Sequence, residues 1–162
     1  MKEAKARNPS VITYGMSWGV PGWIDNQTGY YGPDNIEYQV NWAKCARDYH
    51  GINIDYLGLW NERGQNQPTY ILQLRQALDA ASLTHTGLVL MDGRFDTGLM
   101  SNLEMNASLT KAVSAIGLHY PCNQPHPEVQ QQLGLKYWSS EDWWSEAEWG
   151  GAACWAKLLN QK

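Results

Sequence analysis

The sequence of 162 residues lacks the features that would assign it to several broad functional classes. It has no run of lysine or arginine and a net charge of −4, so nothing favours a nucleic-acid-binding protein. It has no apolar stretch of the roughly 18 residues that a membrane span needs. Three cysteines without a CxxC motif do not indicate a zinc site, and the N-terminal segment MKEAKARNPS has no apolar signal region.

Phenylalanine is also nearly absent, whereas tryptophan and tyrosine are abundant. The chain has 1 Phe, 9 Trp and 9 Tyr. Both abundant residues carry a flat apolar face and a polar tip. Such faces stack on the C–H side of sugar rings, although a Trp-rich core is the simpler explanation of the composition. The composition therefore permits a carbohydrate site without establishing one.

The order of apolar segments predicts alternating strands and helices in one domain, residues 1–162, without repeats or a linker. Strands are expected at 11–16, 54–60, 87–91, 115–119 and 136–140, and helices at 35–49, 69–82, 101–113 and 151–159. Asp34 is expected to cap the first of these helices, and Pro68 suits the first turn of the second.

This alternation predicts an α/β fold with a parallel sheet covered by helices. A doubly wound sheet and a partial (β/α)8 TIM barrel both fit five strands. No GxGxxG motif follows the first strand, which disfavours a dinucleotide-binding fold. A complete TIM barrel usually needs about 250 residues. The chain is therefore too short for a whole barrel.

Polar and ionisable residues follow the predicted strands, where the active sites of α/β barrels form. They are Trp18, Asn61-Glu62, Asp92, His119-Tyr120 and Glu141-Asp142. Asp92 and Asp142 are equally well explained as caps of the helices that follow. Glu62 and Glu141 are less easily explained in this way, because glutamate is a poorer N-cap than aspartate, serine or asparagine.

Two glutamates on one barrel edge suit glycoside hydrolysis. A retaining glycosidase needs two carboxyl groups about 5–5.5 Å apart, one as acid/base and the other as nucleophile. Asn61, which directly precedes Glu62, could hydrogen-bond the 2-hydroxyl group of the sugar in the transition state. The sequence therefore predicts a retaining glycosidase with Glu62 and Glu141 as its catalytic pair.

Several motifs in the same order resemble the galactocerebrosidase (galactosylceramidase) family. IDYLGLWNER at 54–63 is similar to the family's acid/base strand, and WSSED at 138–142 to its nucleophile strand. GMSWGVPGW at 15–23 is similar to the family's LPWxxPGW loop. The sequence at 116–121, IGLHYP, and the C-terminal Cys154-Trp155 with Leu159-Asn160-Gln161 also fit. The resemblance covers nearly the whole chain.

The resemblance implies a (β/α)8 barrel that hydrolyses a terminal β-galactosyl group from glycosphingolipids. It implies Glu62 as proton donor and acceptor, Glu141 as nucleophile, and Trp18, Asn61 and His119 as substrate-binding residues. It implies no metal or organic cofactor, and a substrate that a lipid-transfer activator protein could present. A lysosomal or secreted glycoprotein is expected, in agreement with the sequons at 26–28 and 106–108.

The chain also departs from the family pattern. It would hold strands three to seven of the barrel, without strands one, two and eight, the accessory β domains, or a substrate-binding arginine. Trp143-Trp144 and Gly93 stand where the family has an aromatic–serine pair and an asparagine. Cys154 resembles a cysteine whose disulfide partner lies downstream of this segment, and MKEAKARNP resembles an internal helix of the family. We therefore expect a fragment of the catalytic barrel.

Two alternatives remain open. The pair of glutamates is shared by other retaining β-glycosidases of the same barrel type, such as glucosidases and glucanases. A non-catalytic remnant is a further alternative, because a barrel without three strands exposes unpaired strand edges. We expect the isolated chain to be inactive even though its catalytic pair is present.

Overall fold

The computed structural model describes all residues of the chain except 26–28, 121–125, 127, 142–148 and 161–162. Five strands form one parallel sheet: β1 (Tyr14–Met16), β2 (Tyr56–Gly58), β3 (Gly87–Gly93), β4 (Ala115–His119) and β5 (Lys136–Glu141). The helices are α1 (Lys2–Arg7), α2 (Gly22–Asp25), α3 (Pro33–His50), α4 (Pro68–Ala80), α5 (Thr97–Met105), α6 (Ala107–Ala112), α7 (Glu128–Leu133) and α8 (Trp149–Asn160).

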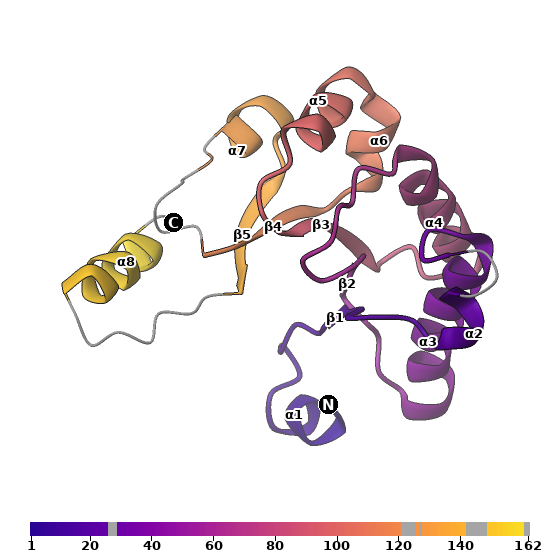
Figure 1. Cartoon of the computed structure of the whole chain (residues 1–162). Coiled ribbons are helices and arrows are strands. Elements are labelled where there is room, and N and C mark those ends of the chain that lie inside the picture. Colours follow the sequence, from indigo (N-terminus) through magenta and orange to yellow (C-terminus); the bar gives the residue numbers. More distant parts are fainter. Residues whose placement is uncertain (26–28, 121–125, 127, 142–148, 161–162) are drawn as a thin grey trace.

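The strand order distinguishes between the two folds that the sequence left open. The strands lie in the sheet in the order β1-β2-β3-β4-β5, and every neighbouring pair is parallel. A doubly wound sheet reverses its strand order at a switch point, whereas a (β/α)8 barrel adds each strand beside the previous one. The sheet is therefore a section of a barrel. Figure 1 shows α3 to α7 along the outer side of an arc, with the strands on its inner side.

The two faces of the sheet have different partners. The outer face buries apolar side chains such as Leu57, Leu88 and Ile116 in one core with the helices. On the inner face, Trp138 of β5 reaches the rings of Tyr56 and Tyr14, with centroids 4.7 Å and 6.5 Å away. Because Tyr14 and Trp138 lie on the two edge strands, this contact shows that the sheet curves around them.

Glycines on the inner face make room for side chains of the neighbouring strands. A Cβ atom on Gly87 would lie 2.8 Å from the ring of Tyr56, and one on Gly117 would lie 2.8 Å from Oγ of Ser140. In small barrels, the side chains that fill the interior often alternate between small and large. The inner layer of this section follows that rule.

Most predicted elements are confirmed, with shifted ends. The strand at 115–119 has the predicted bounds, and Pro68 is the first residue of α4. The prediction that Asp34 caps the helix at 35–49 is wrong, because α3 begins at Pro33 and Gly32 is its N-cap residue. Pro33 suits this first position because it has no N–H to leave unsatisfied.

The predicted helix at 101–113 is two helices. Residue Asn106 has extended backbone angles, and its side-chain oxygen accepts hydrogen bonds from the backbone N–H groups of Ser108 and Leu109. Asparagine is a strong N-cap residue, so it ends α5 and starts α6. Helix α1 lies in MKEAKARNP, the segment that resembles a helix of the family, whereas no helix was expected at α2 or α7.

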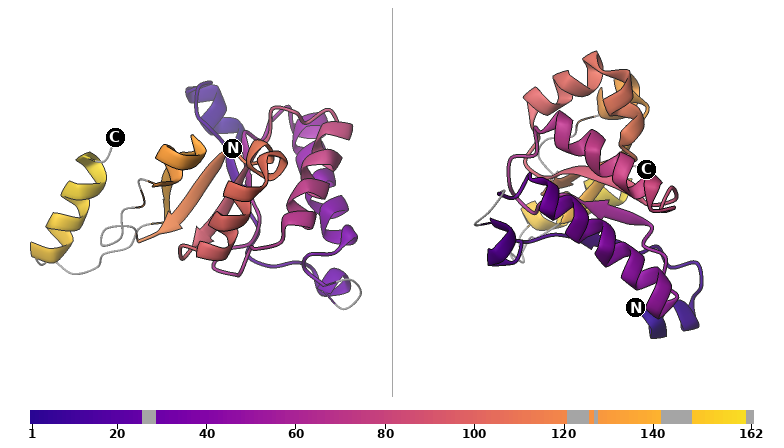
Figure 2. Two further views of the ribbon diagram at one scale, coloured as in Figure 1. Left: turned by 90° about the horizontal axis from the view of Figure 1, so that it is seen from above. Right: turned by 90° about the vertical axis from the view of Figure 1, so that its right-hand side faces the viewer.

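Helix α8 lies apart from the sheet and its covering helices in Figures 1 and 2. Cys154 in this helix is disulfide-bonded within the chain, and Cys45 is free. The expectation that the partner of Cys154 lies beyond this chain is therefore wrong. The partner is outside the described residues, as is Cys122.

Candidate active site

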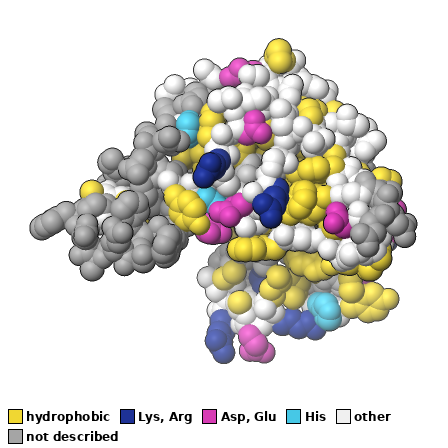
Figure 3. All heavy atoms as spheres, viewed as in Figure 1, with side chains coloured by type: hydrophobic (Ala, Val, Ile, Leu, Met, Phe, Trp, Pro, Cys, Tyr) yellow, Lys and Arg dark blue, Asp and Glu magenta, His cyan; other side chains and the backbone are white. Residues whose placement is uncertain are grey.

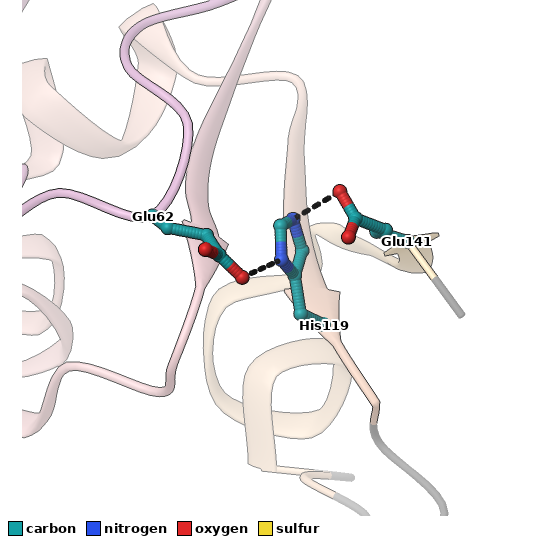
Figure 4. A group of neighbouring side chains, drawn as sticks. All are labelled: Glu62, His119 and Glu141. Atoms are coloured by element: carbon teal, nitrogen blue, oxygen red, sulfur yellow. Dashed lines mark hydrogen bonds and ion pairs between the residues drawn. The ribbon is translucent and has the colours of Figure 1, made fainter. Parts of the chain in front are cut away.

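The carboxyl ends of the strands bring Glu62, Asp92, His119 and Glu141 together. Nδ1 of His119 lies 3.0 Å from Oε1 of Glu62, and Nε2 lies 3.3 Å from Oδ1 of Asp92. Nε2 also lies 3.9 Å from Oε2 of Glu141. Figure 4 shows the imidazole ring between the two glutamates, which come from different sides of the cluster. The two predicted glutamates thus face the same point.

The separation of the glutamates is short. One carboxylate oxygen of Glu62, one of Glu141 and one ring nitrogen of His119 all lie within 4.8 Å of one another. Such a group could surround a small cation. However, both ring nitrogens of His119 are already in hydrogen-bond contact with carboxylates, so the ring has no nitrogen free for an ion. The arrangement suits proton transfer better than metal binding.

The glutamates differ in their remaining contacts. Oη of Tyr120 donates a hydrogen bond of 2.7 Å to Oε1 of Glu141. The Glu62 side chain is 51% exposed, compared with 33% for Glu141. Glu141 is therefore held as a hydrogen-bond acceptor by a tyrosine, whereas Glu62 faces the histidine and open space.

Asp92 is the most deeply buried of the four residues, with an exposure of 0%. Oη of Tyr14, on the inner face of β1, donates a hydrogen bond to its Oδ2 atom. Burial, and secondarily the charge of Asp92, raise the pKa of Tyr14 far above its usual value, so the phenol keeps its proton. The N-cap of α5 is Asp96. Asp92 is therefore part of the site and not a helix cap.

The backbone of this edge is strained. Among the described residues, five non-glycine residues have positive φ, and four of them lie here: Glu62 at 51°, Met91 at 74°, Asp92 at 30° and Tyr120 at 53°. Each such conformation costs on the order of 1–3 kcal/mol and tends to occur at functional sites. The surrounding contacts must offset this cost.

Those contacts are backbone and amide hydrogen bonds between the loops. The N–H of Glu62 donates to the carbonyl of Asp92 at 2.9 Å. The buried side chain of Gln65 donates to the carbonyl of Trp60 at 2.6 Å and accepts from the N–H of Met91 at 3.0 Å. A Cβ atom on Gly93 would lie 3.2 Å from Cα of Glu62, so this glycine permits the close approach of the two strand ends.

Asn61, which precedes Glu62, and Trp18, on the loop after β1, make no contact with the cluster among the described interactions. Asn61 is buried, its N–H donates to the carbonyl of Ser17, and its Oδ1 atom has no hydrogen-bond partner among the described residues. Trp18 is 71% exposed on the loop after β1, and its carbonyl accepts a hydrogen bond from the indole of Trp60. An unsatisfied buried amide oxygen and an exposed aromatic face are both suited to a polar ligand with apolar faces.

A cavity of about 690 Å³ extends from Glu62 and His119 toward the loop after β3. Its lining includes Arg63, Arg94 and Phe95. The ring of Phe95 stacks on His126 with centroids 3.7 Å apart. Figure 3 shows acidic and histidine side chains meeting on this face, with basic side chains to either side. The cavity thus adjoins Glu62 and not Glu141.

Glu62, Glu141 and His119 were predicted from the sequence, whereas Tyr14 was not predicted and Asp92 had two possible roles. His119, expected beside the site, lies between the two glutamates. The first sequon, at 26–28, together with Asp142 and Trp143-Trp144, lies outside the described residues. No helix within the described part of the chain has the length and apolar character that crossing a membrane requires.

Comparison with solved structures supports the fold. SrfJ from Salmonella typhimurium matches with a TM-score of 0.72 and 18% identity, over 90% of this chain and 40% of that one. The glycoside hydrolase family 30 subfamily 8 xylanase Xyn30A from Clostridium acetobutylicum matches with a TM-score of 0.68 and 18% identity, over 96% of this chain and 46% of that one. Both comparisons are consistent with a section of a (β/α)8 barrel.

Sequence comparison is more specific. The galactocerebrosidase of Danio rerio is 40% identical over 99% of this chain, and those of Mus musculus and Homo sapiens are 38% and 37% identical over the same share. The chain spans 24% of the length of each of these relatives. The family model of glycosyl hydrolase family 59 matches residues 1–162. The chain therefore belongs to glycosyl hydrolase family 59.

Proposed function

We propose that this chain carries the catalytic pair of a retaining β-galactosidase that acts on galactosylceramide-type glycosphingolipids. The observation that carries the proposal is the short separation of Glu62 and Glu141. A carboxylate oxygen of one lies within 4.8 Å of a carboxylate oxygen of the other. Inverting glycosidases separate their carboxyl groups by about 6.5–9.5 Å to admit a water, whereas retaining enzymes keep them about 5–5.5 Å apart. The spacing favours a covalent glycosyl-enzyme intermediate.

The contacts of the two glutamates support different roles. Glu141 accepts a hydrogen bond from Tyr120, which suits an ionised carboxylate that attacks the anomeric carbon. Glu62 contacts the ring of His119 and adjoins the cavity beside Arg63 and Arg94. A general acid must lie beside the leaving group, so the aglycone would occupy this cavity.

The neighbouring residues suit a sugar. The exposed face of Trp18 could stack on the galactosyl ring, and the unpartnered Oδ1 atom of Asn61 could accept a hydrogen bond from its 2-hydroxyl group. The similarity to galactocerebrosidases supports galactose and a ceramide-type aglycone. A lysosomal location and presentation of the lipid by an activator protein belong to the same proposal.

Labelling with a 2-deoxy-2-fluoro-β-galactosyl fluoride tests the assignment. In the full-length protein, we expect the label on Glu141, located by peptide mass spectrometry, and no label in Glu141→Gln. In Glu62→Ala, azide should restore turnover of aryl galactosides and give the β-galactosyl azide. A label on Glu62, or an α-azide from the Glu62 variant, would reverse the two roles.

The same reagents test the alternatives. Labelling by the gluco-configured probe and not by the galacto-configured one would favour another retaining β-glycosidase. The isolated chain is expected to be inactive, since β1 and β5 have no further strand partner among the described residues. Turnover of an aryl galactoside by the isolated chain, abolished in Glu141→Gln, would contradict that expectation.

A further inference from the structure

His119 has more hydrogen-bond acceptors around it than a neutral imidazole can satisfy. Its side chain is only 2% exposed, and it contacts carboxylates from three different parts of the sheet. Glu62 follows β2 and lies at Nδ1, Asp92 of β3 lies at Nε2, and Glu141 of β5 lies farther away at 3.9 Å. Tyr120 packs its ring edge-on against the imidazole.

The hydrogen bonds of His119 determine how many protons this cluster holds. An ionised carboxylate only accepts hydrogen bonds, and a neutral imidazole has one N–H group. The contacts of His119 with Glu62 at 3.0 Å and with Asp92 at 3.3 Å are both hydrogen bonds only if two protons are present. The group of three therefore holds one proton more than a neutral ring between two carboxylates.

The surroundings of Asp92 indicate where that proton lies. Tyr14 donates to Oδ2 of Asp92, and its phenol stays protonated because burial, and then the carboxylate itself, raise its pKa. With one oxygen accepting from Tyr14, the other is best satisfied by an N–H on Nε2 of His119. Glu141 competes poorly for this N–H, because it is farther away and already accepts from Tyr120.

Nδ1 of His119 then faces Glu62 without a proton of its own. The second proton must lie between these two residues, either on the Glu62 carboxyl group or on the ring. We propose that Glu62 and His119 share the proton that the leaving group receives, and that Asp92, held by Tyr14, fixes the ring in the tautomer that makes this possible. His119, Asp92 and Tyr14 are positioning residues, since they act through Glu62.

This inference rests on the proposed function for the use of the proton. In the first step, the carboxylate of Glu141 bonds to the anomeric carbon while the bond to the glycosidic oxygen breaks. Glu62 passes the shared proton to that oxygen, and the aglycone leaves as an alcohol. In the second step, Glu62 takes a proton from the attacking water, the bond to Glu141 breaks, and the shared proton is restored.

Asp92→Asn gives a sharp test, because the amide is nearly isosteric with the carboxyl group. The Asn side chain can donate to Nε2, which moves the ring proton to Nδ1. Nδ1 would then donate to an ionised Glu62, and both contacts of His119 would persist with one proton fewer. The variant should therefore lose general-acid assistance while keeping Glu62 available as a base in the second step.

Leaving-group dependence in the full-length protein measures this loss. Turnover of an alkyl β-galactoside, which needs the proton, should fall by about 100-fold or more in Asp92→Asn. Turnover of 2,4-dinitrophenyl β-galactoside, whose leaving group needs no proton, should fall far less, and the alkaline limb of the kcat/KM profile for the alkyl substrate should move to lower pH. Asp79→Asn, on the outer surface of α4, is the matched control and should leave the ratio of the two rates unchanged. Equal losses for both substrates would indicate a merely structural role and overturn the proposal.

The ring itself can be observed without turnover. Nitrogen-15 spectra of the histidine rings in the full-length protein report which ring nitrogens are protonated, and the His119 signals are identified by their loss in His119→Gln. We expect a protonated Nε2 in the wild type and a neutral ring protonated at Nδ1 in Asp92→Asn. A neutral ring protonated at Nδ1 in the wild type would overturn the proposal. Absence of turnover with every galactoside would count against the galactosidase assignment alone, and the spectra would still decide the proton count.

Discussion

Gly58→Ala should displace Asp92 or Tyr14 without changing any ionisable residue. Gly58 lies on the inner face of β2, where a Cβ atom would lie 2.7 Å from Oδ2 of Asp92 and closer still to Oη of Tyr14. Real Cβ atoms essentially never make contacts below 3.0 Å, so one of these groups must move. Both belong to the hydrogen bond that we infer fixes the ring of His119.

The magnitude follows from the groups involved. Overpacking a buried position costs typically about 1–3 kcal/mol. A hydrogen bond to a charged group contributes about 1.5–3 kcal/mol. If the Asp92 carboxylate moves away, the overpacking is relieved but the hydrogen bond from Tyr14 is lost. The two costs are therefore alternatives and do not add. We expect the free energy of unfolding to fall by about 2 kcal/mol.

Urea unfolding followed by tryptophan fluorescence measures the stability, and the ratio of alkyl to dinitrophenyl galactoside turnover measures the acid function. The ratio should fall in Gly58→Ala as it does in Asp92→Asn. Gly22→Ala is the matched control, because nothing lies within 4 Å of a Cβ atom there. Wild-type stability and an unchanged ratio in Gly58→Ala would refute the close approach of Tyr14 to Asp92.

Two further predictions concern stability. Burial opposes ionisation of Asp55, but hydrogen bonds from Thr13 outweigh it and lower the pKa of Asp55. The stability that these bonds confer is therefore present above the unfolded-state pKa of about 3.9 and is lost as pH falls through the folded-state pKa. Urea midpoints should show Asp55→Asn destabilised at neutral pH, with a difference from the wild type that shrinks below about pH 4; a difference independent of pH would contradict this. Gln65→Leu leaves the carbonyl of Trp60 and the N–H of Met91 unpaired, and should cost about 1–3 kcal/mol in the same assay; unchanged stability would show that water replaces the amide.

The sequence predicted the barrel section well because each strand reads as a short apolar run that ends in polar residues. The strand at 115–119, which ends at His119, is one example, and it is buried throughout. Alternation of strands and helices does not specify strand order, however. The doubly wound alternative was excluded only by the pairing of β1 to β5 in sequence order.

The site was predicted in part for the same reason. Glu62 and Glu141 each follow a strand, and the carboxyl ends of parallel strands meet at one edge. The contact between Tyr14 and Asp92 spans 78 positions and depends on which side chains point inward. Asp92 after an apolar strand looks like a helix cap in sequence, and only its burial and its partners identify it as part of the site.

The local breaks in helices were missed because side chains compete with the regular pattern. Apolar spacing continues through Asn106, yet its side chain satisfies the first N–H groups of α6 better than a continuous helix allows. The same side chain belongs to the sequon at 106–108. Its Oδ1 atom makes the capping bonds, and its exposed position leaves the amide nitrogen, the atom that a glycan modifies, on the surface.

The inner aromatic layer and the strained strand ends belong to one arrangement. Trp138, Tyr56 and Tyr14 fill the barrel interior below the site, and Tyr14 extends from this layer to Asp92. Asp92 in turn holds His119 and, through its backbone carbonyl, the N–H of Glu62. Because a packed interior resists displacement, the position of Glu62 is determined by a rigid layer and not by its own exposed loop. Replacing Trp138 with a smaller residue should therefore shift Glu62 by way of Tyr14 and Asp92. Trp138 itself makes no contact with either glutamate among the described interactions.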